Sequence, residues 1–414
     1  MACCRTAAHG LRGRERIMLN FAPSEEEMWK IPIKVSPPRL SDEEINTKYA
    51  KRELRIVTES NREQLPNFVE ALKRPGWMEL RPFYQRRPRW DKARQSKLIE
   101  SFIMNVPVPP LFVYESGLAK YEVMDGQQRI TAVLDFYTNK LTLEGLEQWP
   151  ELNGCIYDTL PSEMRKGLDR RSISYIVLLK ESATTTEEEA LLRQEVFERL
   201  NTGGIKLSYQ ETRNALYQGP FNTLLLELVR NATFRKVWGL PPYSESAEKH
   251  RAPDLITNRM YVEMKDVEII LRFFALRHAD NYQRGMKGFL NLYMVRARSF
   301  TEDDMTFLRN LFEETVALGH AIYGDLLAHP WDANKNAWSP RPQIAFADAV
   351  MVGLSKHTPN AAALVDRRND IIQHTAELFT QHPPGTFTGR GNTKKDVQER
   401  IKFFEDMLQR HLPQ

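Results

Sequence analysis

The feature that most constrains the fold is a seven-residue run, MDGQQRI at positions 124–130, which joins a predicted strand directly to a predicted helix. Upstream, residues 111–114 and 121–124 are rich in β-branched and aromatic side chains and connect through Gly117, which predicts a hairpin or two neighbouring strands. Downstream, apolar residues recur at i, i+3, i+4 and i+7, namely Ile130, Val133, Leu134 and Tyr137. This spacing predicts a helix that packs its apolar face on the sheet.

The turn inside this run places polar side chains where a helix begins. The first N–H groups of a helix lack intrahelical partners, and the helix dipole is positive there, so the position favours an anion. Gln127, Gln128 and Arg129 occupy this first turn, directly after Asp125-Gly126. Two interpretations stay open: a phosphate-binding turn, or an ordinary Asp-Gly turn with a solvated first helical turn. Asp125 could also simply cap its own helix.

Composition excludes several classes of protein. The 414 residues are 42% hydrophobic and 27% charged, as in soluble globular proteins of two or three domains. The net charge of +4 does not by itself indicate nucleic-acid binding, so any basic surface must be local. Cys3, Cys4 and Cys155 give neither a disulfide framework nor a zinc spacing. With no apolar run near the ~18 residues of a membrane span, we predict a cytoplasmic protein without membrane contact.

The first half of the chain is predicted to contain an extension and an α/β module. Residues 1–45 are polar and interrupted by prolines, which indicates a flexible N-terminal extension. Apolar stripes predict helices near 65–72 and 95–103, and an apolar run at 173–179 suits a buried strand. We therefore expect a module of both helices and strands over residues 46–220.

The second half is predicted to be mostly helical. Gly219-Pro220 ends the preceding helix, and no repeat period follows it. Helical spacing of apolar residues then recurs in five stretches, at 221–229, 262–277, 303–323, 360–380 and 396–410. The predicted fold class is α+β, with a helical domain over residues 221–414.

A polar loop between two helix ends is predicted after residue 200. Asn201-Thr202-Gly203-Gly204 ends one helix, and a capping box from Ser208 to Glu211 begins the next. Backbone N–H groups of small residues can approach a ligand closely, but the same residues equally suit a helix C-cap.

The helix after this loop carries amide and arginine side chains on one face. Gln210, Arg213, Asn214 and Tyr217 stand at i, i+3, i+4 and i+7. A solvated face would be richer in lysine and glutamate. The stripe therefore favours the wall of a pocket.

A basic stretch with aromatic residues covers positions 81–94 and includes Tyr84, Gln85 and Arg86. Cations mixed with aromatic faces suit a nucleotide or a nucleic-acid backbone. A solvated loop is the alternative. For Trp90, packing into the core is the favoured role.

Four motifs, in this order along the chain, resemble the N-terminal domain of GmrSD-type restriction endonucleases, a family of the ParB/sulfiredoxin-like superfamily. The tyrosine-glutamine-arginine segment at 83–90 ends at a tryptophan, and a helix with a proline loop follows at 98–111. The DGQQR motif occupies 125–129, and an asparagine-threonine-glycine loop lies within 197–211. The resemblance covers roughly residues 50–220 and implies a ParB-like α/β module.

The resemblance implies that the DGQQR turn lines a nucleotide pocket. Arg129 would pair with a phosphate, the glutamine amides would donate hydrogen bonds, and Asp125 would hold Mg²⁺ or orient water. The implied catalytic residues are Asp125, Gln128 and Arg129, with Asp125 as metal ligand. The implied nucleotide-binding residues are Tyr84, Gln85, Arg86, Gly126, Gln127, Asn201, Thr202, Gly203, Gly204, Gln210, Arg213 and Asn214.

The leading hypothesis is a nucleotide-binding, NTP-hydrolysing module that uses NTP and Mg²⁺ in DNA-related defence or restriction. Its expected partners are DNA, a nuclease or defence protein, or further copies of the chain. One alternative is a non-catalytic DNA-binding or regulatory subunit. A metal-dependent DNA nickase is less favoured, because no second carboxylate ligand accompanies Asp125. The scattered histidines make no recognisable HNH nuclease site, which many members of the family carry in a further domain.

Overall fold

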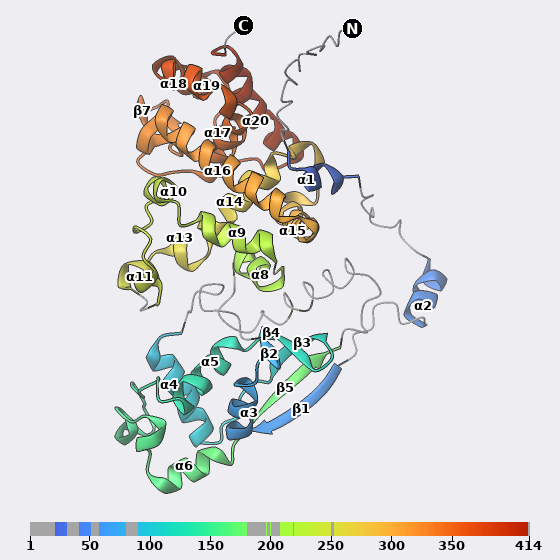
Figure 1. Cartoon of the computed structure of the whole chain (residues 1–414), viewed down its shortest axis with the longest axis vertical. Coiled ribbons are helices and arrows are strands. Elements are labelled where there is room, and N and C mark those ends of the chain that lie inside the picture. Colours follow the sequence, from blue (N-terminus) through green and yellow to red (C-terminus); the bar gives the residue numbers. More distant parts are fainter. Residues whose placement is uncertain are drawn as a thin grey trace, which may run out of the picture.

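The chain folds into an α/β lobe and a helical lobe (Figure 1). The computed structural model describes residues 21–30, 41–50, 58–79, 90–179, 196, 199, 208–217, 219–249 and 252–412. The predicted α+β class is confirmed, since the α/β lobe contains a five-stranded sheet and the helical lobe follows it. None of the helices in these ranges is long and apolar enough to cross a membrane.

The sheet of the α/β lobe is mixed. Its strands are β1 (Thr58–Gln64), β2 (Met78–Glu79), β3 (Leu111–Gly117), β4 (Lys120–Asp125) and β5 (Ser172–Leu178), in the order β1-β5-β3-β4-β2. The pairs β1/β5 and β3/β4 are antiparallel, whereas β3/β5 and β2/β4 are parallel. The predicted hairpin through Gly117 and the predicted buried strand are thus confirmed as β3, β4 and β5.

Four helices accompany this sheet: α3 (Leu65–Leu72), α4 (Lys92–Ile103), α5 (Gln127–Tyr137) and α6 (Ser162–Asp169). Both α3 and α4 pack against α5, and the single-turn helices η2 (Pro150–Leu152) and η3 (Tyr157–Thr159) follow it. The core consists of apolar side chains from the sheet and these helices, including Phe68, Ile99, Val113, Val123, Ile130, Val133, Phe136 and Val177. The helix predicted after the DGQQR turn therefore buries its apolar face as expected.

The helical lobe contains α8 to α20 and a short hairpin. Its helices are α8 (Tyr209–Leu216), α9 (Pro220–Leu228), α10 (Ala232–Val237), α11 (Glu245–Lys249), α12 (Pro253–Ile256), α13 (Arg259–Val262), α14 (Lys265–Leu276), α15 (Gly285–Arg296), α16 (Glu302–Tyr323), α17 (Ile344–Ser355), α18 (Ala361–Asp366), α19 (Arg368–Gln381) and α20 (Lys394–Gln409). The hairpin pairs β6 (Trp331–Asp332) with β7 (Ala337–Trp338). Single-turn helices are η6 (Ala279–Asn281), η7 (Ala297–Ser299), η8 (Gly324–Leu326) and η9 (Thr358–Asn360).

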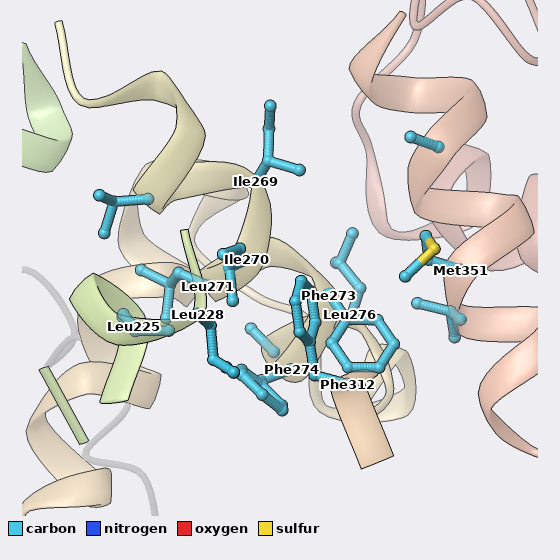
Figure 2. Packing of buried hydrophobic residues seen from close by; sticks show 14 of the residues in the cluster. Leu225, Leu228, Ile269, Ile270, Leu271, Phe273, Phe274, Leu276, Phe312 and Met351 are labelled. Atoms are coloured by element: carbon cyan, nitrogen blue, oxygen red, sulfur yellow. The ribbon is translucent and has the colours of Figure 1, made fainter. Parts of the chain in front are cut away.

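A group of aromatic rings packs together in the core of this lobe. Phe273 and Phe274 of α14 meet Phe312 of α16, and the Phe273 and Phe312 ring centroids lie 5.6 Å apart (Figure 2). Met351 of α17 lies on the other side of this cluster in the same view. α17 packs against α14, α16 and α20, which places it at the centre of the lobe.

The N-terminal segment at residues 21–30 belongs to the helical lobe. Its helix α1 (Pro23–Glu27) contacts η7, and Ala22, Glu25 and Met28 are buried. Within the extension predicted for residues 1–45, this segment is therefore docked on the protein. A further helix, α2 (Asp42–Ala50), follows in the described part of that region.

Helix α8 also packs on the helical lobe, against α14 and α15. Its capping box is present as predicted, with the Ser208 hydroxyl accepting from the Glu211 N–H. α8 therefore precedes the domain boundary predicted after residue 220, although the helices that it contacts belong to the helical lobe.

Candidate functional site

The DGQQR motif forms a tight connection between β4 and α5. Asp125 is the last residue of β4, where it pairs with Phe112, and Gly126 is the N-cap of α5 with φ at 97°. A Cβ atom on Gly126 would lie 2.3 Å from Leu111 Cδ2, so a side chain there would collide with the core. Only glycine suits this position, because the backbone is left-handed and the neighbouring strand lies against it.

Arg129 folds back over this turn. Its Nη2 donates to Asp125 Oδ2 at 2.7 Å, and its Nη1 donates to the Pro109 carbonyl at 2.8 Å. The side chain is only 11% exposed, so this contact is largely shielded from water. The guanidinium therefore ties the proline loop to the turn, using two of its five N–H donors.

The N-terminus of α5 has no side-chain cap, because Gly126 cannot provide one. By contrast, Asp91 caps α4 and Ser208 caps α8 with a side-chain oxygen. The Arg129 Nη2 atom lies 3.0 Å from the position of a Cβ on Gly126. An uncapped helix N-terminus and a guanidinium thus occur at one turn, which is the arrangement that favours an anion.

The remaining polar residues of the motif differ in exposure. Gln127 is buried, whereas Asp125, Gln128 and Arg129 are half-buried. The Asp125 carboxylate accepts a hydrogen bond from the Arg129 side chain. A residue that only capped its own helix would instead accept from a backbone N–H of the first helical turn. Gln128 and Arg129 are therefore the side chains of the first turn with access to the surface.

The stripe predicted on α8 is a buried network in the helical lobe. Arg213 is 2% exposed, and its Nη1 donates to Gln210 Oε1 at 3.0 Å and to Glu268 Oε2 at 2.8 Å. Its Nε donates to Asn291 Oδ1 at 2.7 Å. Burial lowers the pKa of Arg213, and the charge of Glu268 opposes this.

Asn214 belongs to the same buried face of α8. Its Oδ1 accepts from Asn222 Nδ2 of α9 at 2.8 Å. These contacts join α8 to its neighbours from within. The described residues thus make two separate clusters, one at the DGQQR turn and one on α8, and a pocket shared by both stays a prediction.

Seven of the predicted site residues lie outside the described ranges, namely Tyr84, Gln85, Arg86, Asn201, Thr202, Gly203 and Gly204. The neighbouring Trp90 is described. It is half-buried against the core of the α/β lobe, as favoured from the sequence, and Arg94 lies over its ring at 5.2 Å.

Two polar groups of the α/β lobe were not predicted as site residues. The Pro109 carbonyl was missed because a backbone acceptor carries no sequence signal. Gln95 of α4 is buried, and its Nε2 atom has no hydrogen-bond partner among the described residues. Its position in the apolar stripe of a helix that packs on α5 was the signal that could have drawn attention to it.

A metal site made from protein ligands alone is not apparent in the described part of the chain, where no three His, Cys, Asp or Glu side chains gather. Asp125 contributes a single carboxylate at the turn, and one of its oxygens binds Arg129. Mg²⁺ commonly uses one or two carboxylates together with substrate phosphates. The turn therefore fits a metal that arrives with a phosphate-bearing ligand.

Comparison with known proteins relates the α/β part of the chain to one family. Residues 43–218 match the family described as GmrSD restriction endonuclease, N-terminal domain. No curated protein and no solved structure matches the chain significantly. The family match relates the chain to restriction and defence proteins, and its range includes the DGQQR turn.

Proposed function

Because residues 43–218 form a domain of the GmrSD restriction endonuclease N-terminal family, we propose that the DGQQR turn binds a nucleotide phosphate in a restriction or defence process. The single observation that supports this most strongly is the uncapped N-terminus of α5 with the Arg129 guanidinium beside it. The backbone N–H groups of the first turn and the guanidinium both favour the same negative charge.

The contacts of the turn suggest a role for each side chain. Arg129 has three N–H donors beyond the two that bind Asp125 and Pro109, and these would pair with phosphate oxygens. Gln128 would donate its amide to the same group. Asp125 holds the guanidinium over the turn, which fixes the position of the charge before the ligand arrives.

Hydrolysis of the nucleotide forms the second part of the proposal. Mg²⁺ would enter with the phosphates, and Asp125 is the carboxylate that would face it; the ion would supply charge neutralisation. Gln128 would orient a water molecule, and Arg129 would stabilise charge that develops on the phosphate.

Calorimetry with each of the four ribonucleoside triphosphates and Mg²⁺ tests the binding. We expect at least one to bind the wild type, and Arg129→Ala to weaken that affinity by roughly ten- to a hundredfold, the loss of a charged hydrogen bond. The absence of binding to the wild type, or unchanged affinity in Arg129→Ala, would contradict the proposal. Phosphate release by the wild type and by Gln128→Ala tests hydrolysis separately.

A matched control uses another arginine in an i, i+4 ion pair. Arg259 pairs with Glu263 at 3.2 Å on α13, and its side chain is 86% exposed. Arg259→Ala should leave nucleotide affinity unchanged. A thermal melt of each variant shows whether loss of the Pro109 contact has unfolded the α/β lobe instead.

One observation favours a second candidate function. The two hydrogen bonds that Arg129 makes within the protein already give the motif a structural role. In a non-catalytic DNA-binding subunit, this structural role would be the motif's whole function. In that case Arg129→Ala would lower thermal stability, no nucleotide would bind, and a mobility-shift assay would detect DNA binding that weakens with salt.

A further inference from the structure

A second site candidate lies on the helical lobe, in a groove between the β6–β7 hairpin and α19. β6 of the hairpin contacts α19, and Figure 1 shows β7 and α19 in the same part of the helical lobe. The groove has a volume of about 400 Å³. This is within the range of small-molecule sites, which is roughly 300–1,000 Å³.

One face of α19 forms a wall of the groove. Its lining residues stand at helical spacing and carry amide, carboxylate, hydroxyl and aliphatic side chains: Asn369, Ile372, Gln373, Ala376, Glu377 and Thr380. The opposite face of the helix is buried in the lobe through Ile371, Thr375 and Leu378. The groove-lining face is therefore a second, separate surface of this helix.

Two indole rings from the hairpin form the other wall. Trp331 and Trp338 pair across the two strands, with ring centroids 5.4 Å apart and planes at 75°. Both rings are half-buried, and Trp338 also meets Tyr323 edge-on at 6.4 Å. Because the two ring planes are nearly perpendicular, a planar ligand would stack on the face of one indole ring only. The other face of that ligand would stay open.

The charges in the groove indicate the chemistry of its ligand. Among the described residues, the lining contains one carboxylate, Glu377, and neither lysine nor arginine. The Gln373 amide donates to Glu377 Oε1 at 3.1 Å, which fixes its orientation. Such a lining disfavours phosphate but suits a neutral planar ring with donors and acceptors at its edge, since asparagine and glutamine pair readily with the edges of bases.

Charged residues stand at the ends of the elements that form the groove. Arg367 and Arg368 are exposed and directly precede Asn369 at the start of α19. Lys335, also exposed, lies in the turn of the hairpin, where it pairs with Asp332 at 3.3 Å. Asp366 and Asp370, which are also exposed, stand beside these arginines, so both signs of charge surround the groove. Phosphate contacts would therefore add little to binding, and the groove itself must recognise the ligand.

We propose that this groove binds an unstacked base of single-stranded DNA, by stacking on an indole ring and by hydrogen bonds from the α19 amides. The match to a restriction endonuclease family supports DNA as the source of this base. The proposal does not depend on nucleotide binding at the DGQQR turn.

Fluorescence anisotropy of a labelled single-stranded oligodeoxynucleotide tests the proposal on the full chain. We expect the wild type to bind, and Trp331→Ala to bind about tenfold more weakly, the effect of losing one stacked base. Gln373→Ala, a surface change on α19, should also weaken binding. Trp149→Ala is the matched control, because Trp149 is an exposed tryptophan of the α/β lobe, outside the groove.

Oligonucleotides that lack bases separate stacking from phosphate binding. We expect an abasic strand of the same length to bind more weakly than the intact strand, and Trp331→Ala to remove that difference. Equal affinity for abasic and intact strands would overturn the proposal, as would equal binding by wild type, Trp331→Ala and Gln373→Ala. Unchanged DNA binding in Arg129→Ala would show that the groove acts independently of the DGQQR turn.

Discussion

Glu25 Oε1 lies 3.1 Å from Arg277 Nη1, although 252 positions of sequence separate the two residues. Both side chains are almost fully buried. The same carboxylate accepts from the Tyr293 hydroxyl at 2.7 Å and contacts His278 Nε2 at 3.0 Å. A five-residue helix near the N-terminus is thus anchored in the helical lobe by a buried ionic network.

Removal of the Glu25 carboxylate should destabilise the protein strongly. We expect Glu25→Ala to lower the free energy of unfolding by about 3–5 kcal/mol, because it leaves buried positive charge without its carboxylate. Urea denaturation measures this loss. Glu27→Ala is the control, since Glu27 and its partner Lys30 are both exposed, and it should cost less than about 1 kcal/mol. Equal losses in the two variants would contradict the anchoring role.

The same network should make the protein less stable in acid. Burial lowers the pKa of His278 from its usual 6.5, although Glu25 opposes this. Burial alone would raise the pKa of Glu25, but Arg277 and His278 outweigh it, so this pKa lies below the usual 4.5. Because both groups bind protons more readily in the unfolded chain, stability falls as pH drops below 6.5 and falls further below 4.5.

Thermal melts at a series of pH values measure this dependence. The second decrease, below 4.5, should be much smaller in Glu25→Gln, since the amide does not titrate. A melting temperature that stays constant from neutral pH down to 4.5 would show that His278 does not contribute.

Gly126→Ala should be more damaging than Gly76→Ala. Both glycines have left-handed backbones, with φ at +97° and +77°, so both variants should lose about 1 kcal/mol to backbone strain. A Cβ at position 126 also collides with Leu111, whereas one at position 76 meets nothing within 4 Å. We expect an additional loss of about 1–3 kcal/mol for Gly126→Ala, measured as a shift in denaturation midpoint. Equal shifts would mean that Leu111 can move aside.

Arg213→Ala should destabilise the helical lobe by about 3–5 kcal/mol. Its guanidinium joins α8 to Glu268 on α14 and Asn291 on α15. Truncation would leave these half-buried groups without their partner and would leave the buried space of the Arg213 side chain unfilled. Denaturation monitored by circular dichroism measures the loss. The exposed Arg259→Ala should change stability by less than about 0.5 kcal/mol. A small effect at position 213 would indicate that water replaces the guanidinium.

Local patterns predicted the elements that bury one face and expose the other. The helix at α5 was predictable because Ile130 and Val133 lie on its apolar side. β1 was missed because it is a polar strand, TESNREQ, at the edge of the sheet, without alternating apolar residues. α17 was missed for the opposite reason: it is buried all round, so no period separates a core face from a solvated one.

The site could be predicted as a turn but not as a set of contacts. The Asp-Gly pair and the apolar stripe beyond it locate the connection between strand and helix. The choice of Pro109 as a partner for Arg129 depends on the register of β3 and β4, which short-range patterns do not contain. Glu25 is a similar case, because its acidic neighbours suggest a solvated segment, while its partners follow some 250 positions later.

The anchoring of α1 has a consequence for the order in which the protein matures during synthesis. Residues 21–30 leave the ribosome long before Arg277 exists, and a helix of five residues cannot bury a carboxylate alone. The α/β domain is complete in the growing chain before most of the helical lobe, and domains generally fold as units in that order. We therefore expect residues 21–30 to be among the last to reach their final position, after the domain that follows them has already folded.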